Sequence, residues 1–227
     1  MHGNRWIIAL VGIVALLVAG GVLFKIRITP NEPPPLPREP LLERPTVGIT
    51  DPQRGPATAP LTVVYFADFG CDSCANVWPT IVALEQDAQF KKRVRFVWKD
   101  FPTHENAFPE VSDLHRAARC AAADGKFWEF QAAAFARIGE IRLRTPVLQK
   151  VIQDAGVNPA ALSACMNGSG ARSLVETARH EGQRLNITVT PTMFILETNK
   201  RFDGIPPYHV LAGNLRNALA QIDAQKP

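Results

Sequence analysis

An apolar run that ends in two closely spaced cysteines constrains the fold of this chain more than any other feature of its sequence. Residues Leu61–Phe69 (LTVVYFADF) are mostly β-branched or aromatic, and Pro60 and Gly70 bound the run. Such a run favours a buried β-strand over a helix. Cys71 and Cys74 follow directly, as the ends of a Cys-Asp-Ser-Cys tetrapeptide. The cysteines are therefore expected at the end of a strand.

The residues after the cysteines predict a strand–helix–strand unit. Apolar residues recur at helical spacing over 75–89, although Pro79 should kink that helix. A second strand is predicted at 94–101. A right-handed βαβ unit of this kind places reactive residues at the carboxyl end of a strand, where α/β folds carry their chemistry.

The rest of the chain predicts a helical insert and then a return to β-structure. Several Ala-rich or amphipathic segments within 104–186 predict helices packed into a compact insert. A strand is expected at 192–198, with 201–205 as its hairpin partner. A helix over 208–224 is expected to close the domain.

Two proline dipeptides in the insert predict helix starts. Thr145-Pro146 and Asn158-Pro159 each combine an N-cap residue type with a proline suited to the first helical turn. Gly125, Gly156 and Gly168 are expected to end helices, because glycine adopts the left-handed conformation that commonly follows a last turn.

The N-terminal region predicts a membrane anchor and a tether. After a short segment 1–5, the stretch 6–28 is long and apolar enough for a helix to cross a bilayer, with charges only near its end. A cleaved signal peptide is the alternative. Positive charges flank both sides of the stretch and do not set its orientation. The segment 29–60 is a proline-rich linker that leads into a domain at 61–227.

Composition limits the partners of the domain. The 227 residues carry a formal net charge of +4, and the basic residues are scattered apart from a short cluster at 91–95. This pattern does not predict nucleic-acid binding. The four cysteines, two of them in the CxxC, fit either a redox protein of an oxidising compartment or a four-ligand metal site.

The spacing of Cys71 and Cys74 favours redox chemistry. The attacking species in disulfide exchange is a thiolate, and an ordinary cysteine thiol with a pKa of about 8.5 is mostly protonated at neutral pH. A helix N-terminus stabilises the anion at Cys71, and the two-residue gap brings Cys74 within bonding distance one turn later. We therefore expect Cys71 to attack and Cys74 to resolve the mixed disulfide.

Cys120 and Cys165 decide between the redox and metal interpretations. A zinc site would need both as further ligands, yet they lie in the helical insert rather than in a second short-spaced pair. A disulfide between them is simpler, and by the chain-entropy model closing a loop of about 45 residues contributes roughly 3 to 5 kcal/mol to stability. Two buried free thiols are the alternative.

Four motifs carry a resemblance to a known family. These are FADFGCDSC at 66–74, KDFP at 99–102, DGKFWEF at 124–130 and VTPT at 189–192. Over about 61–219 the chain resembles the DsbA-like branch of the thioredoxin superfamily, particularly its membrane-anchored bacterial members. The resemblance implies an α/β thioredoxin-like fold with an inserted helical domain, preceded here by a transmembrane helix. It also implies that Pro191 is a cis-proline facing the CxxC, so that Thr190 can pair with substrate backbone.

The sequence departs from that family at two places. Strong oxidases of the family usually carry proline, often with histidine, between the cysteines, whereas this chain has Asp72 and Ser73. A carboxylate beside Cys71 should raise the thiol pKa and weaken oxidising power. Family members also often have an acidic residue six positions before the first cysteine, and Tyr65 stands there.

Several charged residues near the motifs are candidate substitutes for that acid. Asp68, Asp100 and Lys99 are each expected to be surface or strand-end charges. His104 and His115 could tune the thiolate, but surface or capping positions are expected for both, since neither has a second histidine at helical spacing.

Together these features predict a thiol–disulfide oxidoreductase, with the oxidation of exported proteins as the leading direction. A reductase or isomerase of the same fold is the alternative, and a CxxC metallochaperone is a further one. Cys71 and Cys74 are the catalytic pair, and Asp72, Ser73, Thr190 and Pro191 tune or bind. No cofactor and no resident metal are expected. The partners are exported protein thiols and a membrane redox partner, with the catalytic domain held on the extracytoplasmic side of a single-pass anchor.

Overall fold

Strand β2 (Leu61–Ala67) forms the centre of the sheet in the computed structural model of this chain. The structure describes residues 10–11, 13–17 and 42–225. The chain divides into two units, Met1–Glu39 and Pro40–Pro227, and the second carries all of the sheet. In the first unit, residues 10–11 and 13–17 are helical.

The predicted anchor and tether fall largely beyond what the structure describes. Most of 6–28, and 29–41 of the linker, lie outside the described residues. Within the described part of the chain, no helix has the length and apolar character needed to span a membrane.

The sheet has five strands in the order β1-β3-β2-β4-β5. β1 is Gln53–Arg54, β3 is Val94–Asp100, β4 is Thr192–Ile195 and β5 is Lys200–Asp203. β2 and β3 are parallel, and β4 runs antiparallel to both β2 and β5. Every residue of β2 is buried, because helices cover both faces of the strand. This explains its uninterrupted apolar sequence.

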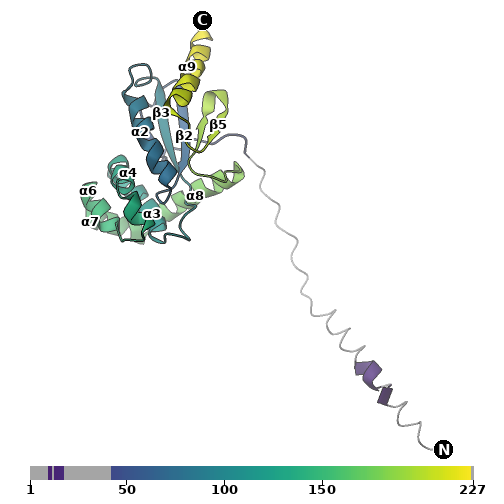
Figure 1. Cartoon of the computed structure of the whole chain (residues 1–227). Helices are drawn as coiled ribbons and strands as arrows, with labels where there is room; N and C mark the ends of the chain where they lie inside the picture. Colours follow the sequence, from purple (N-terminus) through teal and green to yellow (C-terminus); the bar gives the residue numbers. More distant parts are fainter. Residues whose placement is uncertain (1–9, 12, 18–41, 226–227) are drawn as a thin grey trace, which may run out of the picture. The chain divides into compact units, whose positions relative to one another are not determined.

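The helices fall into two groups, those that cover the sheet and those of the insert (Figure 1). α2 is Asp72–Gln86 and α9 is Tyr208–Ala224. Both contribute buried residues to the core on the face of Val63 and Tyr65. The insert contains α3 (Glu110–Ala123), α4 (Phe127–Phe135), α5 (Ile138–Arg142), α6 (Leu148–Asp154), α7 (Pro159–Asn167) and α8 (Gly170–Arg184).

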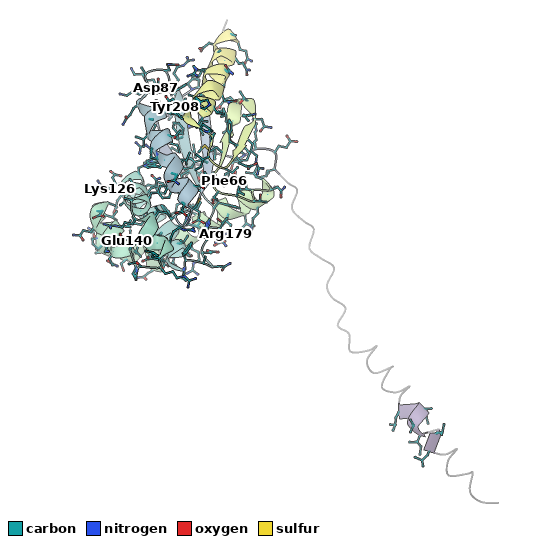
Figure 2. The ribbon with its side chains drawn as sticks, in the orientation of Figure 1. Phe66, Asp87, Lys126, Glu140, Arg179 and Tyr208 are labelled. Atoms are coloured by element: carbon teal, nitrogen blue, oxygen red, sulfur yellow. A yellow bond between two sulfur atoms is a disulfide. The ribbon has the colours of Figure 1, made fainter. Side chains whose placement is uncertain are left out.

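Side-chain contacts tie these layers together. On the opposite face of β2, Phe66 packs in a second core with Phe101 and with Leu185, the residue that follows α8. Figure 2 places Tyr208 beside Asp87, where the Tyr208 hydroxyl donates to the Asp87 carboxylate at 3.0 Å. This bond joins the start of α9 to the end of α2, so the two helices on that face are held in register.

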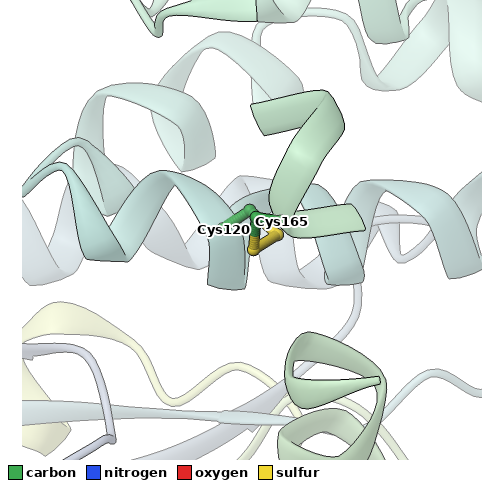
Figure 3. Close-up of a disulfide and its surroundings, with 2 residues drawn as sticks. All are labelled: Cys120 and Cys165. Atoms are coloured by element: carbon green, nitrogen blue, oxygen red, sulfur yellow. A yellow bond between two sulfur atoms is a disulfide. The ribbon is translucent and has the colours of Figure 1, made fainter. Parts of the chain in front are cut away.

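A disulfide joins two helices of the insert. Cys120 of α3 and Cys165 of α7 are bonded, with their Cα atoms 5.8 Å apart (Figure 3). The predicted insert at 104–186 corresponds to α3–α8. The mixed sheet with helices on both faces agrees with the α/β fold expected from the sequence.

One predicted helix start in the insert is wrong and one is confirmed. α6 begins at Leu148 rather than at Pro146, because Glu110 of α3 supplies the cap: its carboxylate accepts from the backbone N–H groups of Val147 and Leu148. The Asn158 side chain does cap α7, accepting from the Ala160 N–H at 2.9 Å.

Candidate active site

Cys71 lies between the end of β2 and the first residue of α2. The turn after the strand is closed by the Cys71 N–H, which donates to the Asp68 carbonyl at 3.2 Å. Cys71 is then the N-cap of α2, and its Sγ accepts from the Cys74 N–H at 3.1 Å. The free N–H groups and dipole of a helix N-terminus favour an anion at this position.

The two thiols differ in acidity because they differ in surroundings. Hydrogen bonding with Cys74 lowers the pKa of the Cys71 thiol to about 7, against the opposing effect of burial. Burial raises the pKa of Cys74, whose side chain lies behind the first turn of the helix. Near neutral pH, Cys71 is thus partly a thiolate while Cys74 keeps its proton. Both are free thiols in the structure.

The loop before β4 lies against the reactive sulfur. The Cys71 thiol donates to the Thr190 carbonyl, with an S···O distance of 3.3 Å. The Thr190–Pro191 peptide bond is cis, and Pro191 is buried. The structure therefore brings Thr190 and Pro191 to the CxxC, although they are more than a hundred residues further along the chain.

A groove of about 380 Å³ opens over Cys71. Its walls come from the CxxC turn, the loop after β3, the end of α5 and the loop before β4; the lining residues are Cys71, Asp72, Ser73, Thr103, His104, Arg142, Thr188, Val189 and Thr190. Most of these side chains are polar, while Val189 is apolar and 44% exposed. Cys71 itself is only 3% exposed, so a substrate would have to reach its sulfur through this groove.

Asp72 does not act on Cys71 as an isolated charge. Its carboxylate forms an ion pair with Arg142 of α5 at 2.9 Å, and both side chains are about half exposed. Arg142 also contacts the Gly70 carbonyl at 3.4 Å. The carboxylate expected to raise the pKa of Cys71 is therefore partly neutralised, and the pKa of Cys71 is lowered rather than raised.

Asp68 directly follows β2, one of the two positions expected for it, but it does not lie on the surface. Asp68 is fully buried below the CxxC turn and accepts from the N–H groups of Gly70, Thr103 and His104 at 2.7 to 2.9 Å. Burial opposes its charge, but hydrogen bonds from His104 and His115 hold the pKa of the carboxyl well below its usual range. Asp68 is thus an anion that links the CxxC turn to the loop after β3.

His115 and Asp100 are also buried, contrary to expectation. The His115 ring lies between two carboxylates, with Nδ1 2.7 Å from Asp100 and Nε2 3.3 Å from Asp68. Burial opposes protonation, but these hydrogen bonds raise the pKa of His115 to about 9. Arg119 of α3 pairs with the far side of Asp100. Alternating charges therefore run from the groove into the core.

Lys99 is also buried, and its charge is paired with two carboxylates. Its ammonium group contacts Asp51 at 2.7 Å and Glu181 at 2.8 Å. Lys99 lies at the end of β3, as one of the two expectations had it, but it is not on the surface, because carboxylates from the segment before β1 and from α8 enclose it. Sequence patterns do not show such distant partners.

Tyr65 occupies the position where the family often has an acid. Its ring is buried beneath the CxxC, and burial raises the pKa of its hydroxyl, so the side chain is neutral. A buried carboxylate lies instead at Asp68, three residues further along.

No sequence pattern indicated the part played by Arg142, because α5 is a short helix without a marked periodic pattern. A signal did exist for Asp68 and His104. Asp68 lies within the FADFGC motif of the resemblance, and His104 lies just after the KDFP motif. Their meeting depends on β2 and β3 being parallel neighbours, so that the two strands end at the same edge of the sheet.

A family model described as Thioredoxin matches residues 48–204. Among curated proteins, a Na(+)/H(+) antiporter NhaA 1 of Mycolicibacterium gilvum is 30% identical over 169 residues, which are 74% of this chain and 27% of the relative. NhaA 3 of Salinispora tropica is 37% identical over 92 residues, 40% of this chain and 14% of the relative. The chain spans less than a third of the length of these curated relatives.

Solved structures share the fold at low identity. The thiol-disulfide exchange protein α-DsbA2 of Wolbachia pipientis matches with a TM-score of 0.64 and 19% identity, over 74% of this chain and 87% of that one. BdbD of Bacillus subtilis matches with a TM-score of 0.61 and 21% identity, over 75% of this chain and 94% of that one. A periplasmic thioredoxin-like protein of Salmonella enterica gives 0.62 and 18%, over 75% and 91%.

Proposed function

This chain belongs to the thioredoxin family, and we propose that it is a thiol–disulfide oxidoreductase whose reactive pair is Cys71 and Cys74. The observation that carries the proposal is the difference in acidity between the two thiols. Cys71 lines the groove and ionises near neutral pH, whereas Cys74 does not line the groove and has a raised pKa. A thiolate that borders a groove, beside a protonated thiol, is the arrangement that exchange requires.

The exchange proceeds in two steps. When the pair is reduced, the Cys71 thiolate attacks one sulfur of a substrate disulfide, and the other substrate sulfur leaves as a thiolate that takes up a proton. Cys74 then loses its proton and attacks Cys71, which forms the Cys71–Cys74 disulfide and releases the second substrate thiolate. Oxidation of a substrate dithiol follows the same steps in reverse. Thr190, at 3.3 Å from the sulfur, lies where substrate backbone would dock.

The acidity of Cys71 bears on the direction of exchange. Reactive cysteines have a pKa of about 7 in thioredoxin and about 3.5 in DsbA, and the lower value goes with the stronger oxidant. The pKa of Cys71, about 7, resembles the first. We therefore favour reduction or rearrangement of disulfides over strong oxidation, in place of the oxidase direction expected from the resemblance.

The proposed substrates are cysteines of exported proteins, and the proposed setting is extracytoplasmic. The Cys120–Cys165 disulfide supports this setting, because such bonds persist in oxidising compartments. The apolar stretch 6–28 supports tethering at a membrane. A membrane redox partner would restore the working redox state of the pair after each exchange.

The metallochaperone alternative is less well supported. Cys120 and Cys165, the two further thiolates that a four-cysteine site needs, are bonded to each other. Across residues 10–11, 13–17 and 42–225, no group of three or more His, Cys, Asp or Glu side chains is arranged to hold a metal ion.

Trapping of the mixed disulfide tests the proposal. The Cys74→Ser protein, mixed with a disulfide-bonded peptide, should accumulate a covalent adduct at Cys71, since no resolving thiol is present. Cys71→Ser is the matched control and should form no adduct and catalyse no insulin reduction. An adduct-free Cys74→Ser protein, or insulin reduction by Cys71→Ser equal to wild type, would exclude the assigned roles.

A further inference from the structure

His104, on the loop after β3, lines the groove beside Cys71. We propose that His104, oriented by Asp68, is the acid–base group that exchanges a proton with the sulfur attacking or leaving Cys71. The inference rests on the proposed function of the CxxC and adds a catalytic residue to it. Asp68 is a positioning residue, since it acts through His104.

Asp68 holds the His104 ring in one orientation, as a general base requires. His104 Nδ1 lies 2.7 Å from the Asp68 carboxylate, and the side chain of His104 is 33% exposed while that of Asp68 is fully buried. The other ring nitrogen, Nε2, has no hydrogen-bond partner among the described residues. Because Asp68 holds Nδ1, the nitrogen free for proton transfer is Nε2, and the ring lines the groove together with Cys71.

Buried charged residues keep the Asp68 carboxylate ionised. The buried chain His115, Asp100 and Arg119 continues inward from its other oxygen, with His115 3.3 Å from Asp68 and 2.7 Å from Asp100. A carboxylate flanked by a cation and several N–H donors keeps its charge. Its orientation of His104 therefore does not depend on pH over the working range.

The close approach of His104 to the CxxC turn is built into the sequence. A Cβ placed on Gly70, the residue before Cys71, would lie 2.8 Å from the His104 Cβ and 2.9 Å from Val111. Only glycine leaves room for the loop after β3 to close onto the turn. The His104 ring also stacks on Phe108, with 6.3 Å between ring centroids and 14° between planes.

The charged groups around His104 come from several elements. Asp68 and the Cys71 thiolate favour its protonated form, whereas Arg142 of α5 opposes it, and the net effect raises the pKa of His104. Glu105, the next residue, is paired with Arg179 of α8 at 2.7 Å. The two effects are thermodynamically linked. A Cys71 thiolate that stabilises protonated His104 is therefore itself stabilised by protonated His104.

In the oxidation of a substrate dithiol, His104 accepts the first proton, and reduction of a disulfide follows the same steps in reverse. When a substrate thiol enters the oxidised site, neutral His104 takes its proton and the new thiolate bonds to Cys71. The Cys71–Cys74 bond breaks with its electron pair on Cys74, which takes a proton from water. A second substrate thiol loses its proton to water and attacks the first substrate sulfur. Cys71 leaves as a thiolate beside the protonated His104. The substrate is oxidised by two electrons and the CxxC is reduced by two.

A thiolate titration and a rate profile test the proposal together. The thiolate absorbance of Cys71 is titrated in reduced wild type, in His104→Gln, and in His209→Gln, an exposed histidine of α9 that serves as matched control. The rate at which a cysteine-containing peptide reduces the oxidised form is measured from pH 6 to 9 for the same proteins. His104→Gln should raise the pKa of Cys71 by about half a unit or more, given the mutual stabilisation of adjacent opposite charges.

The rates of His104→Gln and wild type should differ only at pH values at which the incoming thiol is protonated. At about pH 7.5 the incoming thiol is still mostly protonated and more of His104 is neutral, so His104→Gln is expected to react about tenfold more slowly than wild type there. This is less than the hundredfold or more that is typical of general-base catalysis, because only part of His104 is neutral. At pH 9 the two rates should agree within about twofold. His209→Gln should match wild type in both measurements. An unchanged Cys71 pKa, or equal rates for His104→Gln and wild type at about pH 7.5, overturns the proposal.

Failure of the proposed function would look different. In that case wild type itself would show no peptide-driven reduction above the Cys71→Ser background. The titration does not depend on turnover, so it would still decide whether His104 acts on the Cys71 thiol.

Discussion

Asp72 and Arg142 lie 2.9 Å apart at the rim of the groove, and their pairing limits how strongly either charge acts on Cys71. Both side chains are about half exposed, where solvent and salt screen their fields. The residue between the cysteines therefore has less effect on the reactive thiol than its charge alone would suggest.

Substitutions at this pair should have unequal effects. Asp72→Asn is expected to change the pKa of Cys71 by less than about 0.3 unit, whereas Arg142→Gln leaves Asp72 unpaired and should raise it by about 0.5 unit. Thiolate absorbance as a function of pH measures both shifts. A fall of a full unit in Asp72→Asn would mean that the carboxylate acts on Cys71 without neutralisation.

The two thiols should also differ in reactivity towards an alkylating reagent. In the reduced protein, Cys71 should be modified with a midpoint near its pKa of about 7, while buried Cys74 stays unmodified. Peptide mapping by mass spectrometry after brief exposure across a pH series measures this. Equal labelling of both residues at pH 7 would contradict the assignment of Cys71 as the attacking thiol.

At the scale of elements, the sequence predicted the helices and strands whose positions depend on residues close together in the chain. The β2 run, the start of α2 at the CxxC and the bounds of α9 follow from residue types and periodicity. β1, a two-residue strand, has too few residues to form a pattern. The burial of Asp68, Asp100 and His115 was not predicted, because the three residues come from separate parts of the chain. The parallel pairing of β2 with β3 and the packing of α3 bring them together.

The buried histidine that joins these elements should make stability depend on pH. Because the folded pKa of His115 is about 9 and the unfolded value about 6.5, its protonation stabilises the fold fully below pH 6.5, and this contribution is lost as pH rises to 9. The free energy of unfolding should fall by about 3 kcal/mol over that range, since each pKa unit corresponds to about 1.4 kcal/mol. Urea unfolding of wild type and His115→Gln measures it, and an equal fall in both proteins would contradict this assignment.

The disulfide of the insert should matter for stability and not for exchange. Removing it by Cys120→Ala with Cys165→Ala releases a loop with a sequence separation of 45. The chain-entropy model gives a loss of about 4 kcal/mol in unfolding free energy. Urea unfolding measures the loss, and the insulin-reduction rate of the folded double variant should equal that of wild type. Loss of exchange in a folded variant would assign this bond a role in the reaction.

At the scale of the whole molecule, the sheet positions the site and the inserted helices complete it. β2 presents Cys71, the loop after β3 presents His104, the loop before β4 presents Thr190, and α5 contributes Arg142. The curated relatives carry a similar segment as less than a third of their length. The exchange chemistry proposed here rests on residues that this sheet and these helices bring together.

The most direct test of the account is the redox equilibrium of the CxxC. The protein is equilibrated with a series of glutathione buffers at pH 7, and the Cys71–Cys74 disulfide is quantified by alkylation and mass spectrometry. We predict one reversible two-electron transition with a potential between about −270 and −180 mV, the range from thioredoxin to protein disulfide isomerase. Absence of a reversible Cys71–Cys74 transition anywhere in the series would contradict the central claim.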